Sequence, residues 1–166
     1  MIKIYFKELI DSLKNSHIWI LLSYYDILQR YKRSTLGQFW ITITTGVLII
    51  GMATIYSVLF KIEIEFYIVY IAMNFILWQY LNSTIQESCQ AFISASSYLR
   101  NEKWNLFIFT NRVISRNFIT FLHNYIIVIL VFIYNTPNFK IDCIIFSIFS
   151  FIIINLTLVP ATMIMQ

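Results

Sequence analysis

Basic side chains gather directly before the first long hydrophobic stretch of this 166-residue sequence, and their chemistry is that of anion binding. Arg30, Lys32 and Arg33 precede an uncharged run that extends from about Gly37 to Phe60. If that run crosses a membrane, the three cations lie at the lipid headgroups, where each gains about 1 kcal/mol near anionic lipid. They could contact a diphosphate-linked lipid substrate, and a purely topological anchor explains the same charges.

A second group of candidate side chains lies in the next hydrophobic stretch, where amides and hydroxyls gather on one helical face beside Glu87. Polar groups at membrane depth cost free energy unless they face protein or water. The face therefore predicts either a hydrated, sugar-contacting conduit or hydrogen bonds between helices, and both interpretations stay open. Its members are Gln79, Asn82, Ser83 and Gln86.

Groups that would support catalysis or metal binding are scattered. Cys89 and Cys143 are isolated and have no C-x-x-C spacing, and neither has a histidine nearby, so no metal site is expected. The acids do not converge as a general acid and base would. None of the three glycines is followed by lysine, so the sequence lacks a P-loop for ATP. We expect no catalytic residue, no metal and no cofactor bound by this chain.

The elements that must position these residues are membrane helices. Hydrophobic residues make up 59% of the chain and charged residues 12%, against about 25% charged in soluble proteins. We predict an all-α membrane protein, with amphipathic helices in residues 1–35 that lie on the membrane and a transmembrane domain in residues 36–166. The predicted spans are residues 37–60, 66–86, 117–134 and 143–165, with a cytoplasmic loop at residues 88–116.

Lysine and arginine predict how these helices face. Six of them lie in residues 1–35 and four in residues 88–116, whereas residues 61–65 and 135–142 hold one each. Positive residues favour the cytosolic side of a membrane. The N-terminus and the 88–116 loop are therefore expected in the cytosol. With the charges flanking apolar runs in this way, nucleic-acid binding is not expected.

The residues before the first span carry a family resemblance. Their order resembles the motif of the permease subunit of bacterial type 2 ABC transporters, which export polysaccharides such as O-antigen, capsule and teichoic acid. Residues 98–103, 107–116 and 121–124 are similar to that family's cytoplasmic connection and third span. The motif positions are Asp26, Arg30, Tyr31, Lys32, Arg33, Ser34, Leu36, Gly37 and Trp40.

Three departures accompany the resemblance. Thr45 stands where family members often have proline, and Asn111 or its neighbours stand where Phe-Pro is common. The third departure is length: the family has six spans and this sequence supplies four. We therefore expect a C-terminally truncated form of the six-span fold.

The resemblance implies a transport function in the bacterial inner membrane. Two permease copies would pair with cytosolic ATPase subunits, which use the ATP, and would export lipid-linked polysaccharide. The substrate gate would be formed by the motif residues Arg30, Tyr31, Lys32, Arg33, Ser34, Leu36, Gly37 and Trp40. Residues of the cytoplasmic loop would couple to the ATPase, namely Tyr98, Leu99, Arg100, Asn101, Lys103 and Trp104.

Two alternatives from other classes remain at this stage. One is a small membrane protein without transport activity, such as an assembly or immunity factor. The other is a membrane-embedded transferase acting on lipid-linked sugars, which the scattered acids disfavour. An ATPase that copurifies with the chain would separate the transporter from both.

Overall fold

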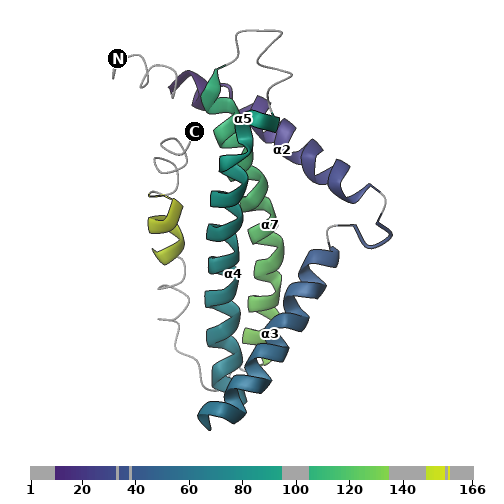
Figure 1. Cartoon of the computed structure of the whole chain (residues 1–166), viewed down its shortest axis with the longest axis vertical. Helices are drawn as coiled ribbons and strands as arrows, with labels where there is room; N and C mark the ends of the chain where they lie inside the picture. Colours follow the sequence, from purple (N-terminus) through teal and green to yellow (C-terminus); the bar gives the residue numbers. More distant parts are fainter. Residues whose placement is uncertain are drawn as a thin grey trace.

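A computed structural model describes residues 10–32, 34–37, 39–94, 105–134, 149–155 and 157. All regular structure within these ranges is helical, as the sequence predicts (Figure 1). A short helical stretch at residues 10–14 comes first, and a turn at Asn15 separates it from the next helix. The helices that follow are α2 (Ser16–Tyr31), α3 (Phe39–Phe60), α4 (Ile64–Cys89), α5 (Ala91–Ser94) and α7 (Leu106–Tyr134).

Three of the described helices are long and apolar enough to cross a membrane: Phe39–Phe60, Ile64–Cys89 and Phe107–Tyr134. The chain is thus compatible with an integral membrane protein. The predicted fourth span, residues 143–165, lies mostly outside the described residues. Its described part is helical at residues 149–155 and 157, and Phe151 stacks on Phe121 of α7 with ring centroids 4.4 Å apart.

A tight reversal joins α3 to α4. Lys61 adopts a positive φ of 54°, which is uncommon for a residue other than glycine. The Ile62 N–H then donates to the Ser57 carbonyl at 3.1 Å, the hydrogen bond that closes a Schellman cap. Glu65 in the first turn of α4 adds a favourable charge at the positive end of that helix. The two helices consequently run antiparallel, as expected for a hairpin.

The core lies where α3, α4 and α7 meet. Helices α4 and α7 pack along each other, α3 crosses both, and α2 lies across the end of the bundle where α4 ends and α7 begins (Figure 1). Gly46 of α3 faces α7: a Cβ added there would lie 3.8 Å from Ile127 Cδ1, an ordinary van der Waals contact. The buried core residues are Ile49, Ala72, Ile76, Leu77, Tyr80, Phe121, Ile127 and Val128.

The third span begins earlier than predicted. The sequence predicts a cytoplasmic loop at residues 88–116. In the structure α4 continues to Cys89, and α7 already begins at Leu106. Arg112 and Arg116 therefore lie inside a continuous helix, where acidic partners from other helices bind their charges.

Candidate functional site

A network of charged side chains joins α2 to α7. Both Arg112 and Arg116 of α7 bind Asp26 of α2. The Arg112 Nε donates to Asp26 Oδ2 at 2.8 Å, and its Nη2 donates to the second carboxylate oxygen, so this contact is bidentate. Arg116 Nη1 donates to Asp26 Oδ2 at 2.8 Å. Paired donors of this kind form the stronger class of hydrogen bonds in proteins.

The network continues from α7 to α4 and back to α2. Arg116 donates through Nη2 to Glu87 Oε2 of α4 at 2.8 Å, and Asn117 Nδ2 donates to the same oxygen at 2.8 Å. Arg30 of α2 donates to Glu87 Oε1 at 3.0 Å. The order Arg112, Asp26, Arg116, Glu87, Arg30 alternates in charge, and an arginine stands at each end. We call these five residues the ion-pair chain.

Burial differs along the ion-pair chain. The side chains of Asp26, Arg112 and Arg116 are 15%, 19% and 16% exposed, whereas that of Arg30 is 50% exposed. Burial by itself would raise the pKa of the Asp26 carboxyl. The hydrogen bonds and charges of Arg112 and Arg116 outweigh this, and the pKa of Asp26 is lowered from its ordinary value. Asp26 is thus a carboxylate at neutral pH.

Helical spacing explains how the sequence brings these groups together. Asp26 and Arg30 are four residues apart on α2, and Arg112 and Arg116 are four apart on α7, so each pair shares one helical face. Ser23 lies one turn before Asp26 and is fully buried. Its hydroxyl is 2.8 Å from the Arg112 carbonyl, which lets the backbones of α2 and α7 approach closely.

A polar cavity opens beside the Arg30 end of the ion-pair chain. Its volume is about 150 Å³. Arg30 and Glu87 lie at its charged side, and Ile41, Ile76 and Phe121 supply the apolar wall. The remaining lining is polar: Gln79, Tyr80, Ser83, Asn117, Thr120 and Asn124. Cavities lined in this way hold water or small polar ligands.

Hydrogen bonds between the three long helices form the deepest part of this polar region. Thr42 of α3 donates to Asn124 Oδ1 of α7 at 3.2 Å. The Asn124 amide lies 3.5 Å from Gln79 Oε1 of α4, and Thr45 approaches the same oxygen at 3.5 Å. Asn124 and Thr45 are both buried. These contacts match the interhelical hydrogen bonding that the sequence left open as one interpretation.

The predicted polar face of the second span divides into two parts. Gln79 and Ser83 line the cavity. Asn82 and Gln86 are exposed instead, and they bind each other through a 3.1 Å hydrogen bond from Gln86 Nε2 to Asn82 Oδ1. Only half of the predicted face therefore meets the site.

The predicted gate residues also divide. Arg30 joins the ion-pair chain, while Leu36 and Trp40 are 47% and 54% exposed. Gly37 has a φ of 55°, which suits glycine in the turn that leads into α3. Lys32 and Ser34 are exposed, Tyr31 is half-buried, and Arg33 lies outside the described residues. The predicted coupling residues Tyr98, Leu99, Arg100, Asn101, Lys103 and Trp104 also lie outside them.

Sequence reasoning missed four residues that build the site. It treated Arg112 and Arg116 as loop charges, and it assigned no role to Asn117 or Asn124. The available signal was the spacing of the two arginines, which matches the four-residue spacing of Asp26 and Arg30. Two departures from the family pattern also have partners: Asn111 Nδ2 donates to Ser12 Oγ at 3.1 Å, and Thr45 joins the hydrogen bonds around Gln79.

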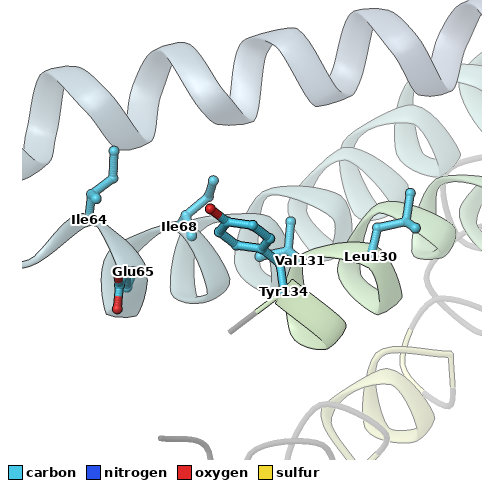
Figure 2. A pocket seen from close by; sticks show the side chains of 6 residues that line it. All are labelled: Ile64, Glu65, Ile68, Leu130, Val131 and Tyr134. Carbon is cyan, nitrogen blue, oxygen red and sulfur yellow. The ribbon is translucent and has the colours of Figure 1, made fainter. Parts of the chain in front are cut away.

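A second cavity of about 310 Å³ lies at the opposite end of α4 and α7. Figure 2 shows Ile68, Val131, Leu130 and Tyr134 around it, with Glu65 at its edge. Its wall is largely apolar, and Glu65 and Tyr134 are its polar lining residues.

The first cavity suits the binding of a small polar ligand, and the ion-pair chain beside it links α2, α4 and α7. Among the described residues, no three His, Cys, Asp or Glu side chains gather as a metal site requires. No family model, curated protein or solved structure matches the chain. Any functional assignment therefore depends on this site and on the motif of residues 26–40.

Proposed function

We propose that this chain is the transmembrane permease subunit of an ABC transporter that exports lipid-linked polysaccharide of the O-antigen, capsule or teichoic acid type. The observation that carries the proposal is the ion-pair chain. Asp26 and Arg30, which are charged positions of the family-like motif, bind α7 and α4: Asp26 is largely buried there, and Arg30 is half-exposed. A motif that only anchored the chain to lipid headgroups would need neither contact.

The ion-pair chain supplies a route for mechanical coupling. In the proposed complex, a cytosolic ATPase binds the region of Arg100 and Lys103, which precedes α7 in the sequence. A displacement of the start of α7 then moves Arg112 and Arg116, and Asp26 carries that displacement to α2. The motif at the end of α2 would thus respond to ATP hydrolysis in a separate subunit.

The extent of exposed apolar surface is consistent with partner helices. Between 22% and 28% of the residues in the three hydrophobic stretches are buried within the chain. Lipid, a second permease copy or further spans of the proposed six-span fold would cover the rest. The proposal places the protein in the bacterial inner membrane as a homodimer with two ATPase subunits, and with the N-terminus in the cytosol.

Association with an ATPase tests the proposal. The tagged full chain is crosslinked in native membranes and purified, and P-loop proteins bound to it are identified by mass spectrometry. We expect one P-loop ATPase, whose yield falls in the Arg100→Glu, Lys103→Glu double variant. Lys61→Glu, in the turn at the other end of the bundle, is the matched control and should leave the yield unchanged.

Two results would contradict the proposal. One is the absence of any P-loop protein from the crosslinked complex. The other is an equal ATPase yield from the wild type and the double variant, which would remove the docking region. The substrate is then assigned by an export assay on membranes that hold both subunits. The lipid-linked polysaccharide that is exported with ATP, and not without it, is the substrate.

A further inference from the structure

We propose that the cavity beside Arg30 is a binding site for a single phosphate group, which the half-exposed Arg30 holds together with the amide of Gln79 in the cavity wall. The phosphate could belong to an anionic lipid headgroup or be free in solution. This site does not depend on transport, because binding to the isolated chain needs neither the ATPase nor a polysaccharide.

The size of the cavity selects a small ligand. A volume of about 150 Å³ equals the share of about five water molecules in the liquid. Drug-sized ligands occupy pockets of about 300–1,000 Å³, so this cavity is too small for a complete sugar chain or nucleotide. A phosphate group with one or two waters matches the space.

Arg30 is the cation that an anion would meet in the lining of the cavity, and Glu87 is the carboxylate beside it. Glu87 is shared by two arginines, and Arg116 and Asn117 already bind its Oε2. Arg30 makes one hydrogen bond to the remaining oxygen, Oε1. Arg30 is the arginine of the ion-pair chain that lines the cavity, and its guanidinium is half-exposed. A planar guanidinium suits the oxygens of a phosphate.

The polar lining can complete the coordination. Gln79 accepts from Asn124 and Thr45 through Oε1, and its amide nitrogen donates none of the hydrogen bonds found among the described residues. That nitrogen supplies donors for phosphate oxygens. Asn117 and Asn124 are 6% and 3% exposed, so the wall is protein and not open solvent. Glu87 opposes an anion, but Arg116 and Asn117 keep its charge compensated when Arg30 turns to the ligand.

Protection of an introduced thiol measures binding. In the full chain with Cys89→Ser and Cys143→Ser, Ser83→Cys places a thiol in the cavity wall, and its reaction with a charged thiol reagent is timed in nanodiscs. One arm adds inorganic phosphate to phosphatidylcholine nanodiscs, and the other uses phosphatidylglycerol nanodiscs without phosphate. A concentration of twice the dissociation constant slows labelling about threefold. Thr120→Cys is a second cavity probe if Ser83→Cys does not fold.

Controls make the result specific. Asn82→Cys on the outward face should react at the same rate in all arms. Arg30→Gln should raise the dissociation constant by about tenfold or more, as the loss of a charge-assisted hydrogen bond does, so that the threefold slowing is almost lost. Lys32→Gln, an exposed neighbouring cation, should leave protection intact.

Each outcome decides the proposal. Protection by phosphate alone assigns a free anion, and protection by phosphatidylglycerol alone assigns a lipid headgroup. Absence of protection in both arms overturns the site. Protection in Arg30→Gln equal to that of the wild type would also overturn it. So would a loss in Lys32→Gln as large as that in Arg30→Gln, because the anion would then respond to surface charge in general and not to Arg30.

Discussion

At the scale of single residues, the ion-pair chain depends on two carboxylates that each serve two arginines. Asp26 binds Arg112 and Arg116, and Glu87 binds Arg116 and Arg30. Removing one acid from such an arrangement leaves partly buried cations without compensation. The cost of breaking a buried pair in this way exceeds the small net stabilisation that the intact pair provides.

Asp26→Asn should therefore destabilise the protein by about 3 kcal/mol. The amide keeps the shape of the side chain but cannot neutralise Arg112 and Arg116. Unfolding in mixed detergent and denaturant measures the change. Asp11→Asn is the control, because Asp11 forms no ion pair among the described residues, and it should change stability by less than about 0.5 kcal/mol. Equal effects of the two variants would contradict the assigned role of Asp26.

Acid should weaken the same contact in a defined pH range. The pKa of Asp26 is lowered from the ordinary 3.8, so its contribution to stability is fully present above about pH 5 and is lost as the pH falls through 3.8 toward the folded-state pKa. The difference in unfolding free energy between wild type and Asp26→Asn should be constant from pH 7 to about 5 and then shrink. A difference that does not begin to shrink as the pH falls below the ordinary pKa of 3.8 would show that charge is not its cause.

At the scale of elements, α2 turns the polar Ser23 and Asp26 and the apolar Ile27 toward the protein, and several large apolar side chains outward. Ser23 and Ile27 are buried against the bundle, whereas Leu21, Tyr25 and Leu28 are 54%, 53% and 46% exposed. The sequence predicts amphipathic helices in residues 1–35 that lie on the membrane, and their contact with lipid stays a prediction. The sequence does not reveal that the other face of α2 binds α7, since Asp26 and its arginine partners are 86 and 90 residues apart.

The outward face of α2 should lie about 5–10 Å into the boundary between headgroups and acyl chains. A fluorescent label on Leu21→Cys should be quenched more strongly by acyl-chain quenchers than a label on Ser34→Cys, which lies in the exposed turn after the helix. Both variants carry Cys89→Ser and Cys143→Ser, and quenching is measured in vesicles. Weaker quenching at Leu21→Cys would place α2 in water or against another protein.

The predicted spans depend on one physical rule, that a membrane helix is an apolar run without charged side chains. The uncharged run that became α3 was found almost to the residue, because no polar side chain interrupts it. For α7 the same rule failed, since Arg112 and Arg116 are tolerated inside a helix once distant acids bind them. The cavity could be predicted only in part. Gln79 and Ser83 were predicted as part of a polar face, but Asn117 and Asn124 line the cavity only because α7 packs against α4, which the sequence does not reveal.

At the scale of the whole molecule, the distribution of charge predicts one orientation. The two predicted cytosolic regions hold ten basic residues, and the two opposite turns hold two. In the fold, the end of α4 and the start of α7 lie at one end of the bundle, and the Lys61 turn lies at the other (Figure 1). Orientation is thus open to a direct test with native and introduced thiols.

Cys89 should react with an impermeant maleimide only when the cytosolic face is accessible. The measurement compares inverted vesicles with intact spheroplasts, in a chain with Cys143→Ser. A Lys61→Cys variant that also carries Cys89→Ser and Cys143→Ser should give the reverse pattern. Labelling of Cys89 in intact spheroplasts would reverse the proposed topology.

Asp26 is far in sequence from Arg112 and Arg116, so it is synthesised well before either arginine can bind it. At about 5–20 residues per second, the ribosome takes roughly 4–17 s to advance from Asp26 to Arg112, 86 residues later. During that interval α2 has neither arginine of α7 to bind, while Asp26 and Arg30 lie four residues apart and can pair with each other. When α7 has been synthesised, Arg112 and Arg116 replace this local pairing and the ion-pair chain forms. The docking of α2 onto α7 is therefore a late step in folding.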